Sequence, residues 1–268
     1  MGLHKNNCRE PLARINGRTL KDALVKTKAR SRFGKIHPKR WVDICPLCDA
    51  YALGIETNHP WPFLSADGVM RTAADFNDNG IEDDCENLDF CGFTFSKSAL
   101  NSAITLIQME DITTNEVEKQ GAAIAQNSDA DLSLKFSQSV CNWGRGQRVW
   151  ANLVRRNNQD SLGKALNEWF RIASDTNNDV EEAISPSVQI NGLGISFASK
   201  HLRMIAPQRY AVLDEVLSTC LGFALNVKGY RLFMQSLKDF QSKYKLDHNL
   251  ATIESGIFSL IRQQVRIE

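Results

Sequence analysis

Apolar and polar residues follow a helical period along most of the chain after residue 96. Apolar residues recur there every three or four positions between short polar breaks, the pattern of amphipathic helices. No segment of this region alternates convincingly with a period of two, so we expect no strands in it. The predicted helices are Ser98–Gln108, Thr114–Gln126, Leu132–Asn142, Gln147–Arg156, Asp160–Ala173, Asp179–Ile184, Phe197–Ile205, Ala211–Leu225, Lys228–Tyr244 and Thr252–Val265.

Residues 1–95 have a different character. They are first basic, then cysteine-bearing, then acidic, with Pro and Gly scattered among them and little helical periodicity. A chain of 268 residues is long enough for one large domain or two modest ones. We therefore expect a mostly α protein with two parts, an irregular N-terminal region over residues 1–95 and a helical domain over residues 96–268.

Charge is segregated although the net charge is only +1. Residues 1–42 carry twelve Lys or Arg against two acids, and residues 75–91 carry seven acids and no base. A basic arm suits a phosphate backbone, because each neutralised phosphate releases counterions. A solvated tail would have the same composition. Charge alone therefore leaves both interpretations open.

The composition, with 43% hydrophobic and 24% charged residues, is that of a globular protein and excludes disordered and fibrous classes. The first residues lack the apolar run of a signal peptide, and no stretch is long enough to span a bilayer. We expect a cytoplasmic, nucleoid-associated protein without membrane contact. In that compartment its seven cysteines favour thiols or metal ligands over disulfides.

Four cysteines suggest a structural zinc site. Cys45 and Cys48 form a C-x2-C knuckle, and Cys85 with Cys91 would complete four thiolates. His37 or His59 are alternative ligands, and thiols with unrelated roles are the competing interpretation.

The acidic run from Asp75 to Glu86 fits the spacing of an EF-hand calcium loop. Position eight of that loop is usually apolar and here is Glu82, and the flanking sequence is not clearly helical. Calcium is also scarce in the cytoplasm. A solvated acidic loop is the favoured interpretation.

A glycine turn lies between two predicted helical segments at Ile190-Asn191-Gly192-Leu193-Gly194, an apolar-x-Gly-apolar-Gly pattern. Glycines permit positive φ and let backbone N–H groups approach a phosphate, and the next helix adds its positive N-terminal end. Leu193 would plug the apolar space between the helices. A lone G-x-G is more often only a tight turn, so the context decides. The residues expected to contact DNA here are Asn191, Gly192, Gly194, Ser196 and Lys200.

Eighteen residues after Ser196, the chain places an acid behind an apolar pair, Val212-Leu213-Asp214. Cleavage of an N-glycosidic bond develops positive charge on the sugar, and a nearby carboxylate stabilises that charge or activates water. Such an enzyme must also extrude the base and therefore needs a firm grip on the backbone. The alternative is an ordinary acid at a helix N-terminus. The hairpin before it favours catalysis by Asp214.

Hairpin, spacing and acid together resemble the helix-hairpin-helix (HhH-GPD) superfamily of DNA glycosylases over roughly residues 130–268, most nearly its bacterial 8-oxoguanine-glycosylase-like group. The resemblance implies a helix-hairpin-helix glycosylase fold and a catalytic Asp214. Members that also nick the strand carry a Schiff-base Lys just after the hairpin glycines, and here Ser196 stands there. Lys200, one turn further on, is expected to contact a phosphate. The resemblance therefore implies a monofunctional enzyme.

The segment from Cys141 to Arg148 falls where members of the superfamily place side chains that fill the gap left by a flipped base. Asn142, Trp143 and Arg148 are suitable for this role, and a plain helix connection with Trp143 in the core is the alternative. Arg203 is expected at phosphate or on a solvated face. Glu254 is expected to orient a neighbour of Asp214 or to serve as a first-turn helix acid.

The function expected is that of a monofunctional DNA glycosylase acting as a monomer on double-stranded DNA, without a catalytic cofactor. Residues 1–95 do not look like the β-rich N-terminal domain of eukaryotic 8-oxoguanine enzymes, so the substrate stays open. One alternative is a hypermodified phage base, such as glucosylated hydroxymethylcytosine, excised in antiviral defence. A non-catalytic helix-hairpin-helix DNA-binding module and a metal-dependent scaffold are alternatives of other classes.

Overall fold

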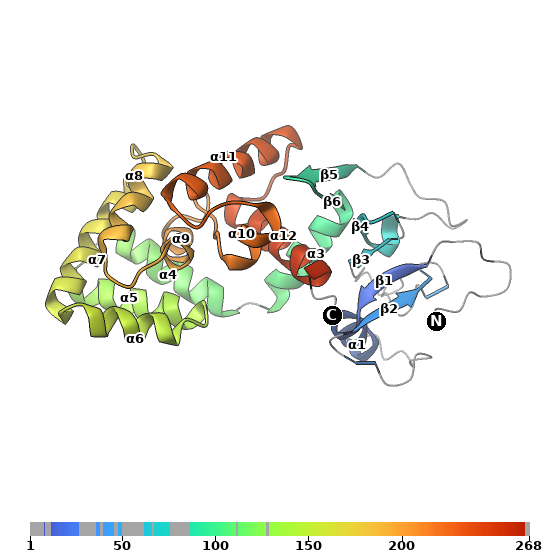
Figure 1. The fold of residues 1–268 in the computed structure, drawn as a ribbon, viewed down its shortest axis with the longest axis horizontal. Coiled ribbons are helices and arrows are strands. Elements are labelled where there is room, and N and C mark those ends of the chain that lie inside the picture. The colour runs from blue at the N-terminus through green and yellow to red at the C-terminus, as the bar shows by residue number, and fades with distance from the viewer. Residues whose placement is uncertain are drawn as a thin grey trace. The chain divides into compact units, whose positions relative to one another are not determined.

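The computed structural model describes residues 8, 12–26, 36, 37, 40–45, 48, 49, 62–65, 67–75, 86–110, 112–126 and 129–265. This part of the chain is mostly helical, with one small sheet (Figure 1). Contacts group the chain into two units, residues 1–107 with 255–268, and residues 108–254. The sequence pattern instead indicates a single break after residue 95. No helix in the described ranges is both long enough and apolar enough to cross a bilayer.

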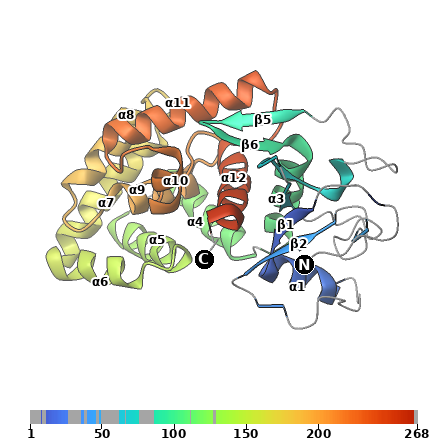
Figure 2. The ribbon, with the colours of Figure 1, turned by 45° about the vertical axis from the view of Figure 1, so that its right-hand side comes forward.

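The first unit contains a six-stranded sheet, which corrects the expectation of an irregular N-terminal region (Figure 2). The strand order is β2-β1-β3-β4-β6-β5, and only the β4–β6 pair is parallel. Strands of two to four residues are too short to show a convincing period of two, so they could not be predicted from the sequence pattern. The strands are β1 (Ala13–Asn16), β2 (Trp41–Ile44), β3 (Phe63–Leu64), β4 (Met70–Arg71), β5 (Asn87–Phe90) and β6 (Phe93–Ser96).

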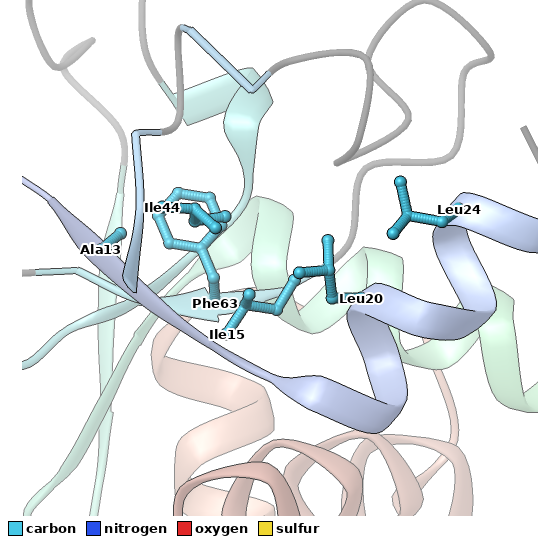
Figure 3. Packing of buried hydrophobic residues seen from close by; sticks show 6 residues of the cluster. All are labelled: Ala13, Ile15, Leu20, Leu24, Ile44 and Phe63. Carbon is cyan, nitrogen blue, oxygen red and sulfur yellow. The ribbon is translucent and has the colours of Figure 1, made fainter. Parts of the chain in front are cut away.

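The core of this unit lies between the first strands and α1 (Gly17–Lys26). Figure 3 shows Ile15 of β1 and Leu20 of α1 side by side, with Phe63 of β3 next to them. Each of these three side chains is fully buried. Together with Ala13, Leu24 and Ile44 they form one apolar cluster. The cluster joins residues that are far apart in sequence, so it fixes how β1, β2 and β3 pair.

Asp75, the first residue of the calcium-loop pattern, has a structural role. It closes the short helix η2 (Ala73–Asp75) and is buried. Its Oδ2 accepts hydrogen bonds from Thr72 N and, at 2.8 Å, from Ser96 Oγ. A carboxylate engaged in this way is not part of a solvated loop. Residues 76–85 lie outside the described residues.

Each helix that the sequence predicts is present, with shifts at its ends. The predicted helix Ala211–Leu225 is too long at both ends, because α10 spans only Glu215–Leu221 and residues 211–214 and 222–225 are not helical. Asn158 is the N-cap of α7. The observed elements are α3 (Lys97–Glu110), α4 (Ile112–Gln126), α5 (Ala130–Trp143), α6 (Gln147–Arg156), α7 (Gln159–Ser174), α8 (Val180–Ile184), η3 (Ser185–Gln189), α9 (Ile195–Ile205), α10 (Glu215–Leu221), α11 (Val227–Lys243) and α12 (Leu250–Val265).

Helix α9 is the centre of the second unit. Its residues Ala198–Ile205 are all buried. His201 lies among the rings of Phe136, Trp169 and Phe170. Its Nδ1 donates to the Phe197 carbonyl at 2.6 Å, so its Nε2 accepts from Ser137 Oγ at 2.9 Å. Burial lowers the pKa of His201 to about 4, so this histidine is a neutral core residue.

Gly121 sets the distance between α4 and α9. A Cβ at this position would lie 2.0 Å from the Met204 carbonyl oxygen, which is backbone and cannot swing away. Only a glycine therefore allows the two helices to come this close. The position of α9, and of every side chain it presents, depends on this approach.

We expect Gly121→Ala to destabilise the protein by about 1–3 kcal/mol, because the overpacked helices must separate. An alanine in an open helical position would instead stabilise by about 0.5–1 kcal/mol, so the sign is diagnostic. Urea denaturation followed by circular dichroism measures the change. Gln120→Ala, at the exposed neighbouring position, serves as the control and should stay within about 0.5 kcal/mol of wild type. Equal or greater stability of Gly121→Ala would contradict the close approach.

Candidate functional site

The hairpin between η3 and α9 is a compact glycine turn. Leu193 N donates to the Ile190 carbonyl at 3.0 Å, and both side chains are buried. Gly192 has a φ of 93°, which explains why glycine is required there. Gly194 has ordinary extended angles, so the expectation of positive φ holds for the first glycine only.

Gly194 is instead notable for the space around it. A Cβ built there meets nothing within 4 Å, and no side chain caps α9 at this residue. The first turn of α9 therefore faces an open approach, with the positive end of the helix dipole behind it. Asn191, also named as a DNA contact, is exposed beside the turn. An anion has access to the backbone here.

Helix α6 supports the hairpin and adds a cation that the sequence did not single out. Asn157 Nδ2 donates to the Asn191 carbonyl at 2.8 Å. The Cδ of Arg156 lies 3.5 Å from the position of a Cβ on Gly192. Arg156 is exposed, so its guanidinium is available beside the turn. The double Arg at the end of α6 was a visible signal, but only the fold shows that it reaches the hairpin.

The α5–α6 connection, expected to fill the gap left by a flipped base, packs against α9. A Cβ on Gly146 would lie 2.1 Å from Phe197 Cζ, and one on Gly144 would lie 2.9 Å from Lys200 Cδ. Asn142 and Arg148 are exposed. Trp143 is half-buried, and its Nε1 donates to Thr114 Oγ1 at 2.7 Å. The indole N–H of Trp143 is thus engaged within the protein, whereas the two polar side chains face solvent.

Asp214 stands at the end of a buried extended segment. Tyr210, Ala211, Val212 and Leu213 are all buried, and Asp214 is the N-cap of α10. Its Oδ1 accepts from Val216 N at 3.0 Å and from Leu217 N at 3.1 Å. Within the described part of the chain, its Oδ2 makes no hydrogen bond. One oxygen of Asp214 thus caps α10, whereas the second has no hydrogen-bond partner among the described residues.

Side chains from three helices hold this segment in place. Tyr230 Oη of α11 donates to the Ala211 carbonyl at 3.0 Å, and Val212 N donates to Glu254 Oε2 of α12 at 3.3 Å. Leu213 N donates to Ser199 Oγ of α9 at 3.1 Å. These bonds take the place of a strand partner, and the position of the Asp214 backbone follows from them.

Lys200 is turned inward, not toward an exposed phosphate. The residue is 8% exposed, and its Nζ lies 3.3 Å from Ser196 Oγ and 4.8 Å from the centre of the Phe197 ring. Burial lowers the pKa of Lys200, while the negative charges of Asp214 and Glu254 act in the opposite direction. The amine therefore lies beside Ser196, and the negative charge of Asp214 favours its protonated form.

Glu254 and Arg203 are buried ionisable residues behind the site, so Arg203 is neither on a solvated face nor at a phosphate. Arg203 Nη1 lies 2.9 Å from Glu118 Oε1, and its guanidinium stacks over Trp143 at 5.2 Å. Burial raises the pKa of Glu254 to about 8, although Arg203 and the hydrogen bond from Val212 N oppose the shift. Glu254 is therefore not only a first-turn helix acid, because its side chain is buried and accepts a hydrogen bond from Val212 N.

The thiols fall into a different set from the predicted one. Cys8, Cys45 and Cys48 form a group whose sulfur atoms lie within 4.8 Å of one another. Cys91 is exposed in the turn between β5 and β6 and is not part of this group. Cys85 and His59 lie outside the described residues. Cys8 was missed because it is 37 residues from Cys45, beyond any local spacing rule.

Comparisons of this chain with protein-family models, with curated proteins and with solved structures found no match.

Glu254 is expected to make the stability of the protein depend on pH. In the unfolded chain it ionises near its ordinary pKa of 4.5, whereas the folded protein keeps the proton up to about pH 8. Between these values the folded state binds more protons. The free energy of unfolding therefore contains a component that falls as pH rises, by up to about 1.4 kcal/mol per pH unit. This component is constant above the folded pKa.

Glu254→Gln should remove this component while leaving an acceptor for Val212 N. The stability of the variant relative to wild type should then rise steadily from about pH 5 to about pH 8. Urea denaturation at a series of pH values measures it, with the exposed Glu168→Gln as control. Parallel pH profiles for wild type and Glu254→Gln would show that Glu254 is ionised in the fold.

Proposed function

We propose that this chain is a DNA glycosylase that extrudes a modified base from double-stranded DNA and hydrolyses its N-glycosidic bond, leaving an abasic site. The observation that carries the proposal is the state of Asp214. One oxygen of this carboxylate is fixed by the first turn of α10, and the other makes no hydrogen bond to any residue that the structure describes. The negative charge of Asp214 also acts to raise the pKa of Lys200, against the effect of burial. A fixed, partly available carboxylate is what stabilisation of a sugar cation requires.

The hairpin supplies the grip on DNA in this proposal. Backbone N–H groups around Gly194 and the N-terminus of α9 meet one phosphate, and Arg156 adds a cation beside Gly192. A firm hold on one phosphate resists the distortion that base extrusion imposes on the strand. Asn142 and Arg148, both exposed, are available to the gap left by the base.

Asp214 then acts on the sugar. As the bond to the base breaks, positive charge develops on the sugar ring, and the unbonded oxygen of the carboxylate stabilises it and directs a water molecule. No metal takes part in this step. A zinc ion on the thiol cluster would serve only the structure of the first unit. We place the enzyme in the cytoplasm at the nucleoid, acting as a monomer.

The substrate is a modified base, either a damaged base in repair or a hypermodified phage base, such as glucosylated hydroxymethylcytosine, in defence. Mass spectrometry of bases released from oxidised, alkylated, deaminated and phage-modified DNA distinguishes these. Release of 8-oxoguanine alone would exclude the defence role, and release from phage DNA alone would exclude repair.

Asp214→Asn is the central test. Asparagine is as good an N-cap as aspartate, so α10 keeps its first turn and the protein stays folded. The negative charge is lost, and base release should fall by about 10²–10⁴-fold while DNA affinity stays close to wild type. Single-turnover base release and a DNA-binding titration at fixed salt measure the two quantities.

Glu215→Gln is the matched control, since it removes an exposed charge at the next position of the same helix. It should leave base release within a few-fold of wild type. If wild type binds DNA but releases no base from any of the four DNA types, the chain is a binding module and not an enzyme.

A second candidate is a glycosylase that also nicks the strand, and the placement of Lys200 favours it. Its amine lies 3.3 Å from the oxygen of Ser196, which stands where strand-nicking relatives of the motif carry their Lys. Burial lowers the pKa of Lys200, which increases the fraction of uncharged, nucleophilic amine. Lys200 is therefore the amine to test for Schiff-base formation, although Ser196 favours the monofunctional enzyme.

For the monofunctional enzyme we expect that borohydride traps no covalent adduct between wild-type protein and a substrate DNA whose base it releases. For the second candidate a trapped adduct should form with wild type and be absent with Lys200→Met, whose unbranched apolar side chain fills most of the space of the buried lysine. Lys164→Met, at an exposed position of α7, is the control for loss of a lysine. Denaturing gel electrophoresis of labelled DNA separates the two outcomes.

A further inference from the structure

The three clustered thiols lie where the first two strands of the sheet are held in register. Cys45 directly follows β2, and Ile44 before it is fully buried in the core of the first unit. Ala13, five residues after Cys8, pairs with Ile44 in the β1–β2 ladder. The pairing of β1 with β2 therefore brings a sulfur from near the start of the chain to the C-x2-C turn.

The geometry of the turn is that of a metal knuckle. Cys48 N donates to Cys45 Sγ at 3.3 Å, so a backbone N–H points at this sulfur. Asp49 shapes the turn from the other side, because Cys45 N donates to its Oδ2 at 2.8 Å and its own N–H donates to the Cys45 carbonyl. Simple packing of apolar thiols does not require a backbone N–H aimed at sulfur.

The sulfur spacing agrees with tetrahedral zinc. With Zn–S bonds of about 2.3 Å, tetrahedral coordination places sulfur atoms about 3.8 Å apart. The Cys8 and Cys45 sulfur atoms are 3.6 Å apart, and all three lie within 4.8 Å of one another. A disulfide would join two of these thiols and leave the third without its partner. Three convergent thiolates are better matched by a divalent ion that prefers sulfur ligands.

We propose that Cys8, Cys45 and Cys48 bind one structural zinc ion that fastens the segment ahead of β1 to the end of β2. In the ranges the structure describes, no further His, Cys, Asp or Glu belongs to the group, so the fourth coordination position is filled by another ligand. Binding displaces the thiol protons, and metal affinity therefore falls in acid. The zinc tethers part of the basic segment of residues 1–42 to the sheet.

The test measures metal and not catalysis, so its outcome is independent of the proposed glycosylase. Full-length protein purified from zinc-supplemented cells is analysed by inductively coupled plasma mass spectrometry. We expect one zinc per chain in wild type and in Cys91→Ser and Cys220→Ser, two exposed cysteines outside the group. Cys8→Ser should lose most of the zinc. Wild type without zinc, or Cys8→Ser with undiminished zinc, would overturn the proposal.

Cobalt provides a readout that does not require the variants to fold. Wild-type protein stripped of zinc is titrated with Co²⁺, and thiolate coordination gives a charge-transfer band in the near ultraviolet that zinc then abolishes. We expect the band to saturate at one Co²⁺ per chain. Removal of zinc should also lower the melting temperature of the wild-type protein, because metal binding is coupled to folding. Absence of the band, or intact mass showing a disulfide in place of zinc, would refute the site.

Discussion

The buried extended segment from Tyr210 to Leu213 is the constraint on which the candidate site depends. A backbone N–H or C=O that is buried without a partner costs about 1–3 kcal/mol, and in the described structure this segment has no neighbouring strand. Tyr230, Glu254 and Ser199 supply the missing partners. Because these side chains come from three different helices, the segment has one position only. Asp214 is the next residue and the N-cap of α10, so the same hydrogen bonds also fix its backbone.

Three ionisable side chains are buried around this segment, and desolvation of a charged group is unfavourable. Lys200 and Arg203 are both less than a tenth exposed, and Glu254 is 4% exposed. The ion pair with Glu118 and the contact with the face of Trp143 offset part of the desolvation free energy of Arg203. Glu254 avoids burying a charge because it keeps its proton up to about pH 8. Less of the desolvation free energy of Lys200 is offset, because its amine contacts only the Ser196 oxygens and the Phe197 ring among the described residues. Buried ionisable groups with shifted pKa values occur both at functional sites and in structural ion-pair networks.

Much of the helical unit could be predicted from the sequence, because helices of ten or more residues show their periodicity several times over. The glycine turn and the spacing to Asp214 were likewise visible. The short strands were not, and residues 211–213 resembled a helix because burial makes them uniformly apolar. Contacts that depend on tertiary structure could not be predicted from the sequence either. They are the burial of the Lys200 amine beside Ser196, the approach of Arg156 to Gly192, and the contact between Cys8 and Cys45.

The division of the chain has a consequence for its synthesis. Residues 108–254 are inserted within the first unit, whose last part is residues 255–268. Gly256 packs against Leu100 and Ile104 of α3, so α12 covers part of the apolar face of α3. At typical rates the ribosome needs on the order of ten seconds to produce the inserted residues. The first unit leaves the ribosome first and is completed last, and a chain cut before residue 255 would carry an unfinished core at its opposite end.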